Sequence, residues 1–292
     1  MILVTGASGL VGSAVAREVA GRTPVRVAVR REGVAAPRGS ERVRLDFHDP
    51  STFDAALRGV SRVFLLRPPR LARARRDFGP FIVAMRSAGV RHVAFLSVRG
   101  ADHNPLLPHR RIERLLERAG LACTFLRPND FMQNFLTVHR ADIIDRGEIW
   151  APAGQGRTSF VDVDDVAAAA ARVLTEPGHA GRAYTLTGPE ALDMTEVAAR
   201  LSGLLGRRVT YRNPGIVRFL LHLRAGNRLD ARGLVMAGVY SVARLGLAAG
   251  TSPDLGQLLG RPPTPFDVFI RNNLSGWLPE LAKDLGGPAT RS

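Results

Sequence analysis

The feature that most constrains the fold lies at the start of the chain, where a short apolar segment runs into a glycine-rich turn. Residues 2–5 have the composition of a strand, TGASGLVG completes the turn, and apolar residues recur at helical spacing over residues 10–20. Gly6, Gly9 and Gly12 therefore either bind a cofactor or only allow a strand to turn tightly into a helix. The remainder of the chain has to decide between these two roles.

Short apolar segments and helical segments alternate after this turn. The helices are expected at 49–57, 72–88 and 108–119, and the strands at 25–29, 43–47, 63–66, 92–98 and 122–128. Strands joined through helices make right-handed crossovers, which produce a parallel sheet covered on both faces. We predict an α/β fold, a Rossmann-like doubly wound parallel sheet with a smaller, mainly helical C-terminal substrate part.

The pattern becomes looser after Pro128. A helix is expected over 131–145, a strand over 159–163 with a helix after it, a strand over 183–188 and a helix over 194–206, and the chain beyond is helical and apolar. We expect an NAD(P)-binding core over 1–130 and a C-terminal substrate or cap region over 131–292, of which 159–188 return to the core.

The positive charge of the chain is spread out rather than gathered in one basic segment. The formal net charge is +15 over 292 residues, and the only lysine is Lys283. The densest cluster, RPPRLARARR at 67–76, is either a solvated helix start or an anion-attracting rim beside a pocket. The distribution argues against a nucleic-acid partner.

Several other classes of protein are disfavoured by the sequence. No apolar run reaches the roughly 18 residues of a membrane span, and the start of the chain does not resemble a signal peptide, so a cytoplasmic protein without a membrane partner is expected. The histidines have no metal-ligand spacing and no G-x-S-x-G occurs, so neither a metal site nor a hydrolase is expected. The single cysteine, Cys123, lies in an apolar run.

The position of the glycine turn favours the cofactor role. A strand precedes the glycines and a helix follows, so backbone N–H groups at the helix start can approach a pyrophosphate. We predict that the turn binds a dinucleotide through Gly6, Ser8, Gly9, Leu10, Val11 and Gly12.

The end of the second strand indicates which dinucleotide is bound. An acidic residue there would bind the ribose hydroxyls of NAD, whereas arginine pairs with the additional phosphate of NADP. In VAVRREG, Arg30 and Arg31 take this position, and Glu32 lies further out. The sequence therefore predicts that NADP(H) is preferred over NAD(H).

Five longer segments resemble one known family. They are TGASGLVG, LDFHDPSTFDAALRGVSRVFLL, FLSVRGAD, HRRIERLLERAGLACTFLRPNDFMQNF and FVDVDDVAAAAARVLTEPGHAGRAYTLTGPEAL. Together they resemble the NmrA-like atypical short-chain dehydrogenases, which include quinone and azo-dye reductases and NAD(P)-sensing regulators. The resemblance implies cofactor contacts for Asp46 and Phe47 beside the adenine, Leu65, Leu66 and Arg67 along the cofactor, and Ser97, Val98, Pro128 and Asn129 near the nicotinamide. Asp46 could instead start a turn, and Val98 could belong to the core.

The usual proton donor of short-chain dehydrogenases is missing. Their Tyr-x-x-x-Lys pair cannot form, because none of the tyrosines has a lysine four residues later. His109 and Glu113 lie four residues apart, so on a helix they share one face, and the carboxylate could orient the imidazole and raise its pKa. We name these two as candidate catalytic residues; the alternative is an ordinary helical pair.

The segment NDFMQNF follows a strand end, where open α/β sheets bind ligands. Phe131, Met132, Asn134 and Phe135 are candidate substrate contacts for a flat, weakly polar molecule. The alternative is that Phe131, Met132 and Phe135 form a seam between the sheet and the cap.

These features predict an NADPH-dependent reductase that transfers hydride to a quinone or a conjugated or aromatic carbonyl compound. The alternative is a non-catalytic NADP(H)-sensing regulator of the NmrA type. The expected partner is a small aromatic or quinone-like substrate, and the sequence leaves open a homodimer.

Overall fold

The computed structural model describes residues 1–30, 36–226, 228–229 and 231–278. By their internal contacts the residues form two compact units. The first unit contains Met1–Asn129, Val163–Leu186 and Ser252–Pro262, and the second contains Asp130–Asp162, Thr187–Thr251 and Pro263–Ser292. The short segment Ser252–Pro262 belongs to the first unit, although we placed it in the C-terminal region from the sequence.

The first unit is built on a seven-stranded sheet with the order β3-β2-β1-β4-β5-β6-β8. All of its strand pairs are parallel, which confirms the predicted doubly wound sheet. The strands are β1 (Ile2–Val4), β2 (Val25–Val29), β3 (Glu41–Arg44), β4 (Arg62–Leu66), β5 (His92–Leu96), β6 (Cys123–Pro128) and β8 (Ala183–Leu186).

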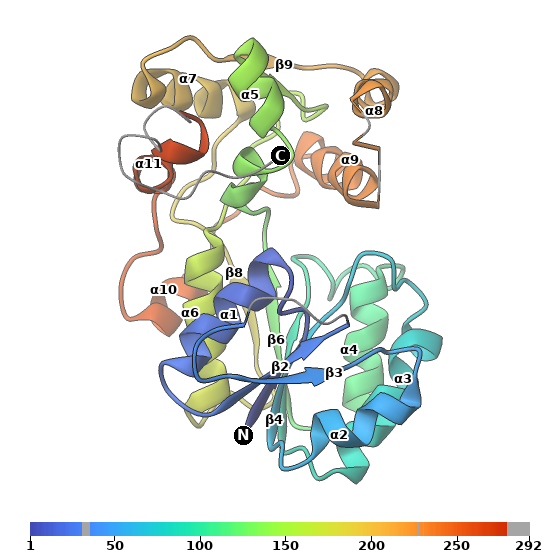
Figure 1. Ribbon diagram of the computed structural model, residues 1–292. Coiled ribbons are helices and arrows are strands. Elements are labelled where there is room, and N and C mark those ends of the chain that lie inside the picture. Colours follow the sequence, from blue (N-terminus) through green and yellow to red (C-terminus); the bar gives the residue numbers. More distant parts are fainter. Residues whose placement is uncertain (31–35, 227, 230, 279–292) are drawn as a thin grey trace. The chain divides into compact units, whose positions relative to one another are not determined.

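Helices cover both faces of this sheet. They are α1 (Leu10–Ala20), α2 (Phe53–Leu57), α3 (Ala74–Ser87), α4 (Pro108–Arg118), α6 (Val163–Thr175) and α10 (Asp254–Leu259). Figure 1 shows α1 and α6 on one face and α2, α3 and α4 on the other. A core that includes Phe53, Phe78, Phe81 and Phe95 fills the space under α2, α3 and α4. Asp254 of α10 accepts a hydrogen bond from the backbone N–H of Thr185 at 2.7 Å, which ties α10 to β8.

The second unit is mainly helical. Its elements are the 3-10 helices η2 (Met132–Leu136) and η3 (Leu274–Gly276), the helices α5 (Arg140–Arg146), α7 (Met194–Leu205), α8 (Ile216–Ala225), α9 (Ala231–Arg244) and α11 (Phe266–Asn272), and the strands β7 (Glu148–Trp150) and β9 (Thr210–Arg212). The two strands pair in parallel. The first turn of α7 is fixed by a capping box, in which Asp193 and Glu196 each accept a hydrogen bond from the other's backbone N–H.

Two predicted elements of this region were wrong. The continuous helix over 131–145 is split into η2 and α5, because two β-branched residues in succession, Thr137 and Val138, are poor helix formers and Thr137 leaves the helical conformation. Residues 159–163 form no strand. Val161 makes a parallel bridge to Phe131 and Thr158 an antiparallel bridge to Leu192, so no continuous ladder exists.

Candidate cofactor site

Two of the three glycines in the opening turn are required by the backbone. Gly6 has a φ of +69°, a conformation that residues with a Cβ rarely adopt. A Cβ at Gly12 would lie 2.1 Å from the carbonyl oxygen of Gly6, so any side chain there would overlap the preceding turn. Both glycines allow α1 to start directly against the end of β1.

Gly9 has no such requirement. Its φ of −102° and ψ of 170° are open to any residue, and an added Cβ would meet only the oxygen of Gly6, at 3.4 Å. Gly9 is exposed and is the N-cap of α1, where no side chain caps the helix and no acidic residue lies in the first turn. The N–H groups at this helix end are therefore available to an anion that approaches the bare backbone of Gly9.

The other turn residues differ in accessibility. Ser8 and Leu10 are exposed, whereas Val11 is buried and can offer a ligand only its backbone. The turn itself lies at the switch point of the sheet, because β2 pairs with one side of β1 and β4 with the other. Ligands of open α/β sheets bind at this crevice.

Thr5 is a site residue that our sequence analysis did not select. Its buried hydroxyl donates a hydrogen bond to the carbonyl oxygen of Phe64 at 3.1 Å and accepts one from the N–H of Leu66 at 2.9 Å. This contact holds the ends of β1 and β4 together directly before Gly6. A polar residue at the end of an apolar strand was the available signal.

At the end of β4, the side chains of Leu66 and Arg67 are partly exposed, whereas that of Leu65 is not. Leu65 is fully buried, because the alternation of a strand directs its side chain to the core, so it can offer a cofactor only its backbone. Leu66 and Arg67 are half-buried, and the side chain of Leu66 would lie 3.0 Å from a Cβ at Gly6. The guanidinium of Arg67 donates to the carbonyl oxygens of Pro69 and Leu71 at 3.1 and 3.0 Å, and so holds the loop after β4.

His109 contacts Arg67, not a carboxylate. The Nε of Arg67 donates to the Nε2 of His109 at 3.2 Å. Burial, followed by the charge of Arg67, lowers the pKa of His109 to about 3. The predicted imidazolium with a raised pKa is therefore wrong, and His109 is a neutral acceptor at neutral pH.

The carboxylate of Glu113 pairs with arginines rather than with His109. It is fully buried, and its two carboxylate oxygens accept from Arg127 of β6 at 3.0 Å each, while Arg110 donates to it at 3.0 Å. Asp102 accepts from the same Arg127 at 3.0 Å. The predicted pair with His109 is thus corrected: a bidentate arginine from the neighbouring strand is a stronger partner for a buried carboxylate than a neutral imidazole. Glu113 fastens α4 to the sheet.

Ser97 carries an unsatisfied polar atom at the end of β5. Its side chain is 4% exposed, and among the described residues its Oγ has no hydrogen-bond partner. A buried hydroxyl without a partner is costly unless a ligand or water completes it, so Ser97 suits a position beside a polar ligand. Val98 is half-buried, Pro128 is buried, and the backbone N–H of Asn129 donates to the carbonyl oxygen of Leu186 at 2.9 Å.

The residues predicted to lie beside the adenine form a turn. The Oδ1 of Asp46 accepts from the N–H of His48 at 3.0 Å, which is the local role that the sequence left open. The half-buried ring of Phe47 packs against Phe78 and Phe81, with ring centroids 4.9 and 5.3 Å apart. Arg30 directly follows β2 and is exposed. Arg31 lies outside the described residues.

The predicted substrate contacts fall in the second unit and separate into two groups. Met132 and Phe135 are each 1% exposed and belong to its core, which agrees with the alternative that the sequence left open for them. Phe131 and Asn134 are half-buried. The amide of Asn134 donates to the Oδ1 of Asp130 at 2.5 Å, and burial raises the pKa of Asp130 to about 7.

Among the described residues, no group of His, Cys, Asp and Glu side chains could hold a metal ion. None of the helices in that part of the chain combines the length and the apolar composition needed to cross a membrane.

A doubly wound parallel sheet with a glycine turn at its switch point defines a Rossmann-type dinucleotide-binding fold. Within this class, the chain belongs to the NmrA-like family, whose sequence profile matches residues 1–220. It is 34% identical over 281 residues to the NAD(P)H azoreductase of Xenophilus azovorans, an alignment that covers 93% of this chain and 97% of the relative.

Solved structures agree with this family. An NADPH-dependent quinone oxidoreductase from Escherichia coli, complexed with NADPH, superposes with a TM-score of 0.85 at 29% identity, over 94% of this chain and 100% of that one. The triphenylmethane reductase of Citrobacter sp., complexed with NADP(H), has a TM-score of 0.85 at 27% identity, over 93% of this chain and 99% of its own.

Proposed function

We propose that this protein is an NADPH-dependent reductase that transfers hydride to a quinone or another conjugated or aromatic carbonyl compound. The observation that carries the proposal is the bare backbone of Gly9 at an uncapped helix start, at the switch point of the sheet. The reductases among its relatives support the reaction class.

Each part of the first unit would have a separate task toward the cofactor. The N–H groups at the start of α1 would bind the pyrophosphate, and Arg30 would pair with the ribose phosphate. The hydroxyl of Ser97 would gain the hydrogen-bond partner that it lacks among the described residues. NADPH, when bound, supplies the hydride.

The residues present favour a substrate that needs little acid catalysis. Tyr-x-x-x-Lys is missing from the sequence, and His109 cannot act as an imidazolium because its pKa is about 3. Reduction of a quinone by hydride leaves an aromatic, stabilised oxyanion, which can take its proton from water. A simple ketone would leave a far more basic alkoxide, so we expect quinones to be better substrates than simple ketones.

The glycine turn and the missing proton donor also suit a non-catalytic NADP(H) sensor, which needs the turn but no proton donor. Anaerobic oxidation of NADPH against a panel of quinones and aromatic ketones, with cofactor binding measured in parallel, separates the two functions. We expect turnover with at least one quinone. NADPH binding without turnover across the panel would favour the sensor. A lack of NADPH binding would contradict both the reductase and the sensor.

The arginines after β2 test the cofactor preference. Replacing Arg30 and Arg31 together by alanine should weaken NADPH binding by about 1–3 kcal/mol, since charge-assisted hydrogen bonds are lost, and change NADH binding little. Titration of both cofactors into the parent and the variant measures this difference. Equal losses for NADPH and NADH would mean that these arginines do not bind the phosphate.

A further inference from the structure

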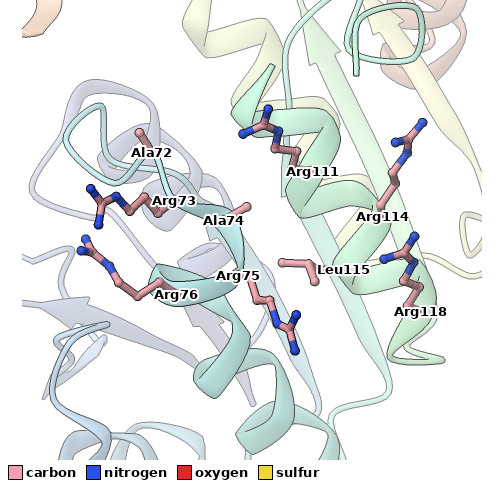
Figure 2. A pocket seen from close by; sticks show the side chains of 9 residues that line it. All are labelled: Ala72, Arg73, Ala74, Arg75, Arg76, Arg111, Arg114, Leu115 and Arg118. Atoms are coloured by element: carbon pink, nitrogen blue, oxygen red, sulfur yellow. The ribbon is translucent and has the colours of Figure 1, made fainter. Parts of the chain in front are cut away.

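The first unit carries a second basic region, on the outer side of α3 and α4. A cavity of about 510 Å³ lies there, and its lining residues, whose side chains Figure 2 shows, are Ala72, Arg73, Ala74, Arg75, Arg76, Arg111, Arg114, Leu115 and Arg118. We call this region the arginine groove. All six arginines are exposed, three from the start of α3 and three from α4.

The charge of the arginine groove is almost uncompensated. Arg76 pairs with the fully buried Asp77, Nε to Oδ1 at 2.8 Å, and Asp77 also accepts from the backbone N–H of Arg73 at 2.9 Å. Within the part of the chain that the structure describes, the other five arginines form no ion pair, and no acidic residue lines the cavity. Like charges that line one cavity repel one another, and an anion bound between them would relieve this repulsion.

The arrangement suits an anion with more than one charge. Arg111, Arg114 and Arg118 are three and four residues apart, so they form a row of about 10 Å along one face of α4. In Figure 2, Arg75 extends into the space between the helices, with Leu115 beside it, whereas Arg73 and Arg76 extend to the side away from α4. A single monovalent ion cannot neutralise charges spread over this length, whereas a chain of linked phosphates can.

We propose that the arginine groove binds a small polyanion made of linked phosphates, either free or as the phosphate chain of a nucleotide. Guanidinium groups form paired hydrogen bonds with phosphate oxygens, so the row along α4 together with Arg75 of α3 can hold successive phosphates. The cavity has the size of small-molecule sites rather than of macromolecular interfaces. This site is separate from the glycine turn and does not depend on the proposed reductase function.

Calorimetric titration with inorganic tripolyphosphate, with and without saturating NADPH, tests the proposal. We expect one site in both conditions, with an affinity that falls as salt is added. The double variant Arg75→Gln/Arg111→Gln, which removes one charge from each helix, should weaken binding about tenfold or more. Titration of ATP in the same series would show whether a nucleotide binds more tightly than the free phosphate chain; either order of affinity at this site supports the proposal.

The matched control is Arg86→Gln/Arg91→Gln, because both residues are exposed arginines outside the groove and the change in charge is the same. This control should bind tripolyphosphate like the parent. Equal losses in the two double variants would overturn the proposal, since the effect would then come from overall charge. Binding that disappears with NADPH or in Gly9→Val would also overturn it, because the anion would then occupy the cofactor turn. Binding of nucleic acid or an acidic peptide without binding of tripolyphosphate or ATP would contradict a small-molecule site.

Discussion

At the scale of single residues, the contact between Arg67 and His109 determines what His109 can do. The imidazole accepts the Arg67 Nε–H at 3.2 Å, so its Nε2 carries no proton, and burial beside a cation keeps the ring neutral. Arg67 in turn holds the loop after β4. We therefore propose that His109 positions Arg67 rather than acting as an acid.

The variants His109→Phe and His109→Gln should therefore behave differently. Phenylalanine removes the hydrogen-bond acceptor of Arg67. Because Arg67 is a predicted cofactor contact, this change should raise the KM for NADPH. Glutamine keeps an acceptor oxygen and should restore much of the parental KM. The pH profile of kcat in the parent should show no inflection from His109 between about pH 5 and 8. Steady-state kinetics of the three proteins measure both effects. A fall of kcat by roughly 10² or more in both variants, together with such an inflection in the parent, would restore the role of proton donor.

The error over Glu113 shows a limit of spacing arguments. Residues four apart on a helix do share a face, but the sequence does not reveal which side chain of another element reaches that face. Here Arg127 comes from β6 and takes both carboxylate oxygens. Contacts of this kind depend on tertiary packing, so they could not be predicted from the chain alone.

At the scale of elements, the sequence predicted the first unit much better than the second. Strands such as Cys123–Pro128 and helices such as Pro108–Arg118 lie within one or two residues of their expected bounds, because each is bounded by glycine, proline or polar residues. In the second unit, the sequence is equally consistent with Met132 and Phe135 contacting a ligand and with both residues belonging to the core. Only the packing places them at 1% exposure.

The start of α1 gives a prediction for an element. Gly12→Ala should destabilise the protein by about 1–3 kcal/mol or more, because the new Cβ would lie 2.1 Å from a backbone oxygen that has no freedom to move aside. Urea denaturation of the parent and the variant measures the change in the free energy of unfolding. An unchanged midpoint would mean that α1 does not approach β1 as closely as described.

At the scale of the whole molecule, buried ionisable groups set the response to acid. Burial lowers the pKa of His92 and His139 to about 4 and that of His109 to about 3, whereas burial raises the pKa of Asp130 to about 7. The stability that neutral histidines contribute is complete above their unfolded pKa, roughly 6.5, and is lost as the pH falls. Asp130 acts in the opposite direction, since its protonated form is favoured in the folded state.

We therefore predict that the free energy of unfolding falls as the pH is lowered from 7 to 5. Three histidines against one carboxyl leave about two protons taken up on unfolding near pH 5, which corresponds to roughly 2–3 kcal/mol per pH unit. Urea denaturation at several pH values measures this slope. Asp130→Asn removes the opposing group and should make the slope steeper. A stability that is flat or rising from pH 7 to 5 would contradict the assignment of neutral, buried histidines.

The most direct test of the account is the affinity of Gly9→Val for NADPH. The backbone of Gly9 accepts a side chain without strain, and an added Cβ meets protein atoms no closer than 3.4 Å, so the variant should fold with nearly the stability of the parent. The valine would fill the space through which a pyrophosphate approaches α1, so calorimetric titration should detect no NADPH binding. If the variant is folded, as verified by circular dichroism, and binds NADPH with the affinity of the parent, the cofactor site proposed at the glycine turn would be contradicted.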